Sequence, residues 1–253
     1  MFFDSHAHLN DERFSDDREK LIESLLDNDI SNVVNIGADV PTSYESIALA
    51  EKYPFIYASV GVHPHDVEDM TDDTLIELEK MAEHPKVVAI GEIGLDYYYD
   101  NSPRELQKKW FIKQMELANK LDLPVIIHSR DAMGDTMEIF KKYPVKKGVV
   151  HCYSGSVESA KEILKLGYYI SLAGPVTFKN SRGLTEVAKF VPIEKLLIET
   201  DCPYLAPEPH RGKRNSSLYV KEVAKKIAEL KEMDIEDVAK ITSQNAKDLF
   251  GIE

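Results

Sequence analysis

The chain has 253 residues, of which 43% are hydrophobic, and this suits one large domain (1–253) with a sizeable buried core. A formal net charge of -13 disfavours a protein that holds nucleic acid on a broad basic surface. No segment is apolar for long enough to cross a membrane and no signal-peptide pattern opens the chain, so we expect a cytoplasmic protein without a membrane partner.

Short, β-branched apolar runs alternate with amphipathic stretches along the chain. The runs predict strands over residues 2–9, 32–38, 56–63, 87–96, 124–130, 148–154, 168–175 and 196–203. Several amphipathic stretches open on Asp, Ser or Pro and close near Gly or Pro, as helix ends do. They predict helices over residues 16–29, 41–54, 73–85 and 103–122, and two C-terminal helices over 216–233 and 235–250.

This alternation predicts an α/β fold. Strands separated by helices of this length form βαβ units and a parallel sheet. Eight such units in 253 residues match a closed (β/α)₈ TIM barrel, whose outer layer the two C-terminal helices would complete. An open doubly wound sheet is the alternative. Two cysteines, Cys152 and Cys202, are too few for a disulfide framework, although a single bridge stays open.

Active groups of such barrels lie at the C-terminal ends of the strands, and ionisable residues gather there in this sequence. Six of the eight runs carry one late in the run, whereas the early halves are apolar. Histidine nitrogen and carboxylate oxygen are the usual ligands of zinc and manganese-like ions, and the number of these groups suggests two ions bridged by a carboxylate. The residues are His6, His8, His63, Glu92, His128, Arg130, His151, Glu199 and Asp201.

Six segments in this order resemble the motifs of the TatD family of metal-dependent hydrolases and deoxyribonucleases. They read DSHAHL, VGVHPH, GEIGLDYY, IIHSR, VHCYSG and ETDCPYLAP with RGKRN, and they cover essentially the whole chain. The resemblance implies an amidohydrolase-like barrel, a divalent-metal site and a nuclease activity that often includes 3′-to-5′ trimming. Relatives often continue GKRN with Glu-Pro, whereas Ser216 and Ser217 follow Asn215 here.

The resemblance also implies roles for residues. Glu92 corresponds to the bridging ligand of two divalent ions, either zinc, manganese or magnesium, and Asp201 corresponds to a metal ligand. Its expected closeness to the bridging water would let Asp201 also accept the proton of that water. Asp96 could replace Glu92, and Glu199 could compete with Asp201. We expect Asp4, on the His6 face of the first strand, to orient an imidazole. The implied metal ligands are His6, His8, Glu92, His128, His151 and Asp201.

DNA is the expected substrate, with RNA as a further candidate, and no obligate protein partner is evident. An acidic protein needs local positive charge to hold phosphate, and His63, Arg130, Arg211, Lys213 and Arg214 are predicted to bind the substrate. Tyrosines just after the strands could stack on bases or simply cap the barrel. The same site could instead hydrolyse a small amide, lactone or phosphoester. A third hypothesis is a non-enzymatic metal-binding protein.

Overall fold

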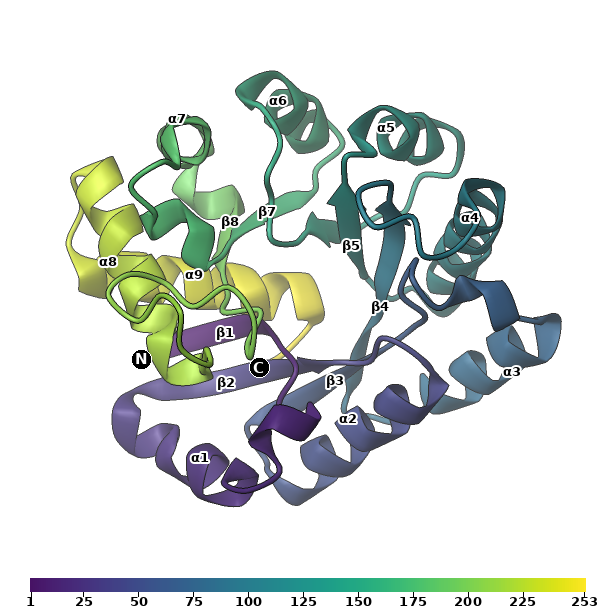
Figure 1. Cartoon of the computed structure of the whole chain (residues 1–253), viewed down its shortest axis with the longest axis horizontal. Coiled ribbons are helices and arrows are strands. Elements are labelled where there is room, and N and C mark those ends of the chain that lie inside the picture. Colours follow the sequence, from purple (N-terminus) through teal and green to yellow (C-terminus); the bar gives the residue numbers. More distant parts are fainter. The chain divides into compact units, whose positions relative to one another are not determined.

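The computed structural model describes all residues from Met1 to Glu253, and strands alternate with helices along the chain (Figure 1). The strands form one eight-stranded sheet in the sequential order β1 to β8, and the fold is a TIM barrel. The (β/α)₈ prediction is confirmed, and the open doubly wound sheet is wrong. The strands are β1 (Phe2–Ala7), β2 (Ile30–Ile36), β3 (Ile56–Val60), β4 (Val87–Asp96), β5 (Val125–Arg130), β6 (Gly148–Val150), β7 (Tyr169–Leu172) and β8 (Leu196–Ile198).

Nine α-helices follow or flank these strands, and the two predicted C-terminal helices are α8 and α9. None of the nine is long and apolar enough to span a lipid bilayer. Cys152 and Cys202 are not joined by a disulfide bond. The helices are α1 (Arg18–Ser24), α2 (Val40–Lys52), α3 (Asp72–Met81), α4 (Arg104–Leu121), α5 (Met133–Lys142), α6 (Val157–Lys165), α7 (Arg182–Phe190), α8 (Val220–Lys231) and α9 (Ile235–Phe250).

Contacts divide the chain into two compact units. The first unit contains residues 1–35, 152–248 and 252–253, and the second contains residues 36–151 and 249–251.

In the first unit, β1 lies between β2 and the segment that follows β8. β1 pairs in parallel with β2, and Ala7 forms a parallel bridge with Cys202. The hydroxyl of Ser5 donates to the carbonyl of Ile198 at 3.0 Å. Residues from the two ends of the chain thus share one buried region.

In the second unit, β4 and β5 form the most extensive strand pair, and their register sets the position of several polar side chains. Gly94 pairs with His128, and Asp96 pairs with Arg130. Gly94 has a φ of +144°, and a Cβ there would lie 1.9 Å from the carbonyl oxygen of His128. Only glycine allows β4 to approach β5 this closely.

Candidate metal-binding residues

The first unit brings three predicted ligands together. Nε2 of His6 lies 3.3 Å from Nε2 of His8, and Oδ1 of Asp201 lies 3.6 Å and 3.4 Å from these two nitrogens. The His6 side chain is buried, whereas the other two are each 14% exposed. The three atoms therefore form a nearly equilateral triangle at the edge of the solvent.

This triangle fits a divalent ion. Nitrogen and oxygen ligands bind zinc at about 2.0–2.2 Å, so two ligands of a tetrahedral ion are about 3.3–3.6 Å apart. The three separations of 3.3, 3.4 and 3.6 Å fall in this range. Two imidazoles and a carboxylate are also the donor types that such ions prefer.

Backbone hydrogen bonds hold the triangle in place. The strand β1 ends at Ala7, and the N–H of His8 donates to the carbonyl of Cys202 at 2.8 Å. The N–H of Asp201 donates to the carbonyl of His6 at 2.9 Å. Asp201 has a φ of +54°, a left-handed conformation that Asp and Asn tolerate better than most residues.

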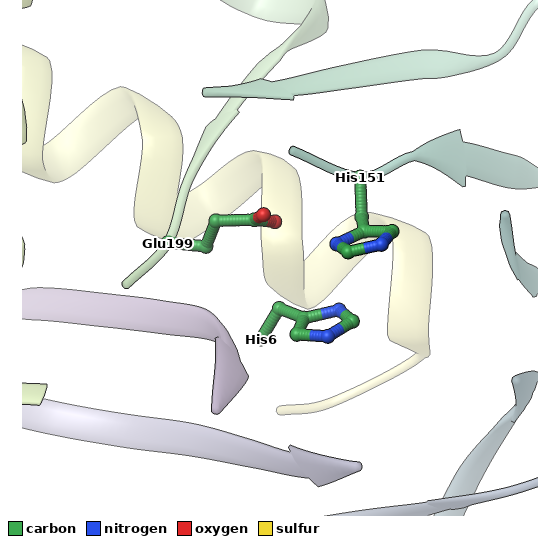
Figure 2. A group of neighbouring side chains, drawn as sticks. All are labelled: His6, His151 and Glu199. Atoms are coloured by element: carbon green, nitrogen blue, oxygen red, sulfur yellow. The ribbon is translucent and has the colours of Figure 1, made fainter. Parts of the chain in front are cut away.

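Two further carboxylates of this unit are buried near these candidate ligands. Figure 2 shows the carboxylate of Glu199, which comes from the segment after β8, and the imidazole of His6 on β1. Glu199 accepts a hydrogen bond from the backbone N–H of Cys152 at 2.8 Å. This contact ties Glu199 to the segment that directly follows His151.

Asp4 has a different role from the predicted one. It accepts hydrogen bonds from the N–H and the hydroxyl of Thr200, at 2.9 Å and 2.6 Å, and it contacts only the backbone N–H of His6. The expectation that Asp4 orients an imidazole is therefore wrong, because its carboxylate points toward Thr200. Burial raises the pKa of Asp4 to about 7, although hydrogen bonds from Ser217 and Thr200 lower it.

The second unit brings three more predicted ligands together. Oε1 of Glu92 lies 2.7 Å from Nε2 of His151 and 3.0 Å from Nδ1 of His128. These two nitrogens are 3.3 Å apart, which is again the spacing of two ligands on one ion. His151 follows directly on β6 (Figure 2).

His128 has a buried acidic partner on its other nitrogen. Nε2 of His128 lies 3.0 Å from Oδ2 of Asp96, which also lies 3.0 Å from Nε2 of His65. Burial alone would raise the pKa of Asp96, but hydrogen bonds from His128, the N–H of Tyr99 and His65 hold this pKa below its usual range. Burial alone would lower the pKa of His128, but the bonds to Asp96 and Glu92 raise it above its ordinary value.

Sequence reasoning considered Asp96 only as a substitute for Glu92. A carboxylate on the second nitrogen of a ligating histidine fixes which nitrogen faces the ion. Asp96 occupies this position for His128. The sequence contained a signal for this position. Asp96 stands four residues after Glu92 on β4, and residues four apart in a strand lie on the same face.

His63 and His65 lie next to this group. Nε2 of His63 is 3.5 Å from Oε1 of Glu92, and the His63 ring is 4.6 Å from the His128 ring and 4.3 Å from the His65 ring. Ligand atoms of His63, Glu92 and His128 all lie within 4.8 Å of one another. Burial lowers the pKa of His63 well below its ordinary value.

The predicted phosphate-binding cations have different surroundings. The guanidinium of Arg211 stacks on the Phe178 ring at 4.2 Å, and Lys213 is exposed. Arg214 instead donates to both carboxylate oxygens of Asp17, at 2.8 Å and 2.6 Å. Arg214 thus already has an acidic partner, which sequence reasoning did not foresee.

Comparison with known proteins gives consistent matches along the chain. A family model described as TatD related DNase matches residues 3–251. The chain is 49% identical over 254 residues to YabD, an uncharacterized metal-dependent hydrolase of Bacillus subtilis, and the match covers 100% of both proteins. It is 37% identical to YcfH, an uncharacterized metal-dependent hydrolase of Escherichia coli K12, over 99% of this chain and 96% of YcfH. The crystal structure of YjjV, a TatD homologue from E. coli, matches with a TM-score of 0.94 and 31% identity, over 100% of this chain and 98% of that one.

Proposed function

Because the chain belongs to the family of TatD-related DNases, whose curated relatives are named metal-dependent hydrolases, we propose that it is a deoxyribonuclease that uses two divalent metal ions. Its substrate is DNA, with RNA as a second candidate, and it removes nucleotides in the 3′-to-5′ direction. The observation that carries the metal proposal is the triangle of His6, His8 and Asp201, whose three separations match those of ligands around one ion.

The ligands divide between the two ions. His6, His8 and Asp201 would hold one ion and His128 and His151 the other, and the family resemblance implies that Glu92 would serve as a ligand of both. Mixed nitrogen and oxygen donors accept zinc, manganese or magnesium.

Bound divalent ions supply an acidified water and positive charge for the phosphoryl oxygen. Side chains of the protein would then accept and hold the protons of the reaction. The carboxylate of Asp201, which lies beside the two histidines, would accept the proton of the attacking water. Asp96 keeps the proton of His128 on Nε2 and leaves Nδ1 to face the ion.

Substrate binding requires local positive charge in a protein whose net charge is -13. Arg130, Arg211 and Lys213 are the candidate cations for the phosphate backbone, and His63 is the candidate hydrogen-bond donor beside Glu92. We assign Arg214 a smaller part, because its guanidinium already pairs with Asp17.

The test is hydrolysis by metal-reconstituted protein. The substrates are end-labelled single-stranded DNA, duplex DNA and RNA, with a panel of small amides, lactones and phosphoesters beside them. A ladder of products shortened from the 3′ end, absent with Asp201→Asn, is the expected result. Hydrolysis of a small amide or lactone without any polynucleotide cleavage would overturn the proposal and favour an amidohydrolase-like activity.

A further inference from the structure

Two adjacent tyrosines just after β4 present their rings to solvent. Tyr98 is 59% exposed and Tyr99 is 55% exposed, and their rings contact edge to face at 5.0 Å. Two adjacent exposed aromatic rings offer faces on which a planar group can stack. The backbone beneath them is fixed, since both N–H groups donate to Oδ1 of the buried Asp96, at 3.0 Å and 2.9 Å.

Arg130 adds a cation to this pair. Its guanidinium lies 4.2 Å from the centre of the Tyr98 ring and 4.8 Å from that of Tyr99. The register of β4 and β5 puts it there, because Asp96 pairs with Arg130 and the N–H of Tyr97 donates to the Arg130 carbonyl at 2.9 Å. Arg130 forms no ion pair with a carboxylate, so its charge is available to an anionic ligand.

A row of neighbouring rings connects these tyrosines with the candidate ligands of the second unit. The Tyr99 ring lies 5.4 Å from the His65 ring, which lies 6.4 Å from the His128 ring. Asp96 links the same residues by hydrogen bonds, because its carboxylate contacts both His65 and His128. A group resting on Tyr99 is therefore separated from a candidate metal ligand only by the His65 ring.

We propose that Tyr98, Tyr99 and Arg130 form a stacking platform for an unpaired base of the DNA strand whose phosphodiester bond is cleaved. This inference rests on the proposed nuclease function and assigns three residues of the second unit to the binding of the strand. Aromatic rings stack on any base, whereas a base inside a duplex already has neighbours on both faces. Arg130 supplies charge for the adjacent phosphate, as the platform requires in an acidic protein.

The test measures binding of single-stranded DNA whose linkages are phosphorothioates, so that it resists cleavage, with 2-aminopurine near its 3′ end. Binding to the parent protein is expected to quench the 2-aminopurine fluorescence. The double variant Tyr98→Leu, Tyr99→Leu should abolish the quenching and raise Kd by about 5- to 150-fold for each base that no longer stacks. Tyr44→Leu removes another exposed tyrosine, on α2, and should change neither quantity.

The proposal can also be tested on the parent protein alone, by comparing two oligonucleotides. The parent protein should bind the intact oligonucleotide more tightly than one with abasic sites at the last three 3′ positions. The difference in Kd should again be about 5- to 150-fold for each base that no longer stacks. Equal affinity for both would overturn the platform. If the parent cleaves small substrates but neither binds nor cleaves any polynucleotide, the proposed function itself fails, which is a separate result.

Discussion

Gln107 and Gln114 lie two turns apart on α4, and the amide of each holds the backbone at the end of a neighbouring strand. Gln107 accepts from the N–H of Asp96 at 2.9 Å and donates to its carbonyl at 3.2 Å. Gln114 does the same for Val62, at 2.7 Å and 3.0 Å. Both glutamines are fully buried, so one face of α4 positions Asp96 and the residue before His63.

Replacing Gln107 with Leu should destabilise the protein and weaken the metal site. The variant leaves two backbone groups of Asp96 without partners, at a cost of about 1–3 kcal/mol for each buried group. Urea unfolding measures the stability, and competition with a chelator measures the metal affinity. Gln114→Leu is the matched control, because it should lose similar stability but retain the affinity of the His128 site. Equal losses of metal affinity in both variants would contradict the specific role of Gln107.

Asp96→Asn should reduce metal affinity about 10- to 100-fold, because it removes the charged acceptor on the second nitrogen of His128. The measurement is titration of the metal-free protein with zinc against a chelator of known affinity. Asp135→Asn is a suitable control, since Asp135 pairs with Lys108 and Tyr97 away from the ligands. If the two variants bind zinc alike, Asp96 does not orient a ligand.

The double variant His6→Ala, His8→Ala should lose at least one divalent ion while it stays folded. Both imidazoles belong to the same triangle, and their removal leaves Asp201 as its remaining donor. Elemental analysis gives the metal content, and circular dichroism checks the fold. His84→Ala tests a histidine that contacts Glu51 on the surface and should retain full metal content. Unchanged content in the double variant would remove β1 from the site.

Asp201→Asn should keep at least one ion and much of the substrate affinity but lose turnover by about 10²- to 10⁴-fold. Asn tolerates the left-handed φ of +54° at this position, so the backbone should not change. Glu92→Ala, in contrast, should lower the occupancy of both ions. Metal content, binding and turnover are measured on the same preparations. Turnover by Asp201→Asn within a few-fold of the parent would redirect attention to Glu199.

The pair Arg211→Gln, Lys213→Gln should raise KM for a polynucleotide and flatten its salt dependence, with a slope smaller by about 0.7–0.9 for each phosphate that is no longer neutralised. Arg214→Gln should behave differently. It breaks an exposed pair with Asp17 and should cost about 1 kcal/mol of stability or less, with a smaller effect on KM. A larger effect of Arg214→Gln on the salt slope would reverse this assignment.

The fold was predictable because its signals are local and repeated. Apolar β-branched runs such as residues 87–96 coincide with β4, and the helix predicted over 235–250 coincides with α9. The family resemblance is confirmed by the matching family model. Strand ends were less predictable. The runs 148–154 and 196–203 continue past β6 and β8, because the chain leaves the ladder where His151, Glu199 and Asp201 turn toward their partners.

The contacts that position the candidate ligands depend on tertiary structure, so their signals in the sequence are weaker than those of the strands and helices. A buried glutamine on an amphipathic helix, such as Gln107, reads as a surface residue until the neighbouring strand end is known. The pairing of Arg214 with Asp17 joins residues 197 positions apart. Asp4 shares a strand face with His6, yet its carboxylate is taken by Thr200 from the other end of the chain.

The bond between Asp4 and Thr200 also bears on how the chain is made. The two residues are 196 positions apart, so the ribosome exposes Asp4 long before it adds its partner. During most of synthesis β1 can pair with β2, but the partners of β1 from the end of the chain have not yet been made. Asp4 then lacks Thr200, Ser5 lacks Ile198 and Ala7 lacks Cys202. A nascent chain or a fragment that stops before β8 therefore cannot finish the first unit. Proteases should therefore cleave prematurely terminated products at this incomplete first unit.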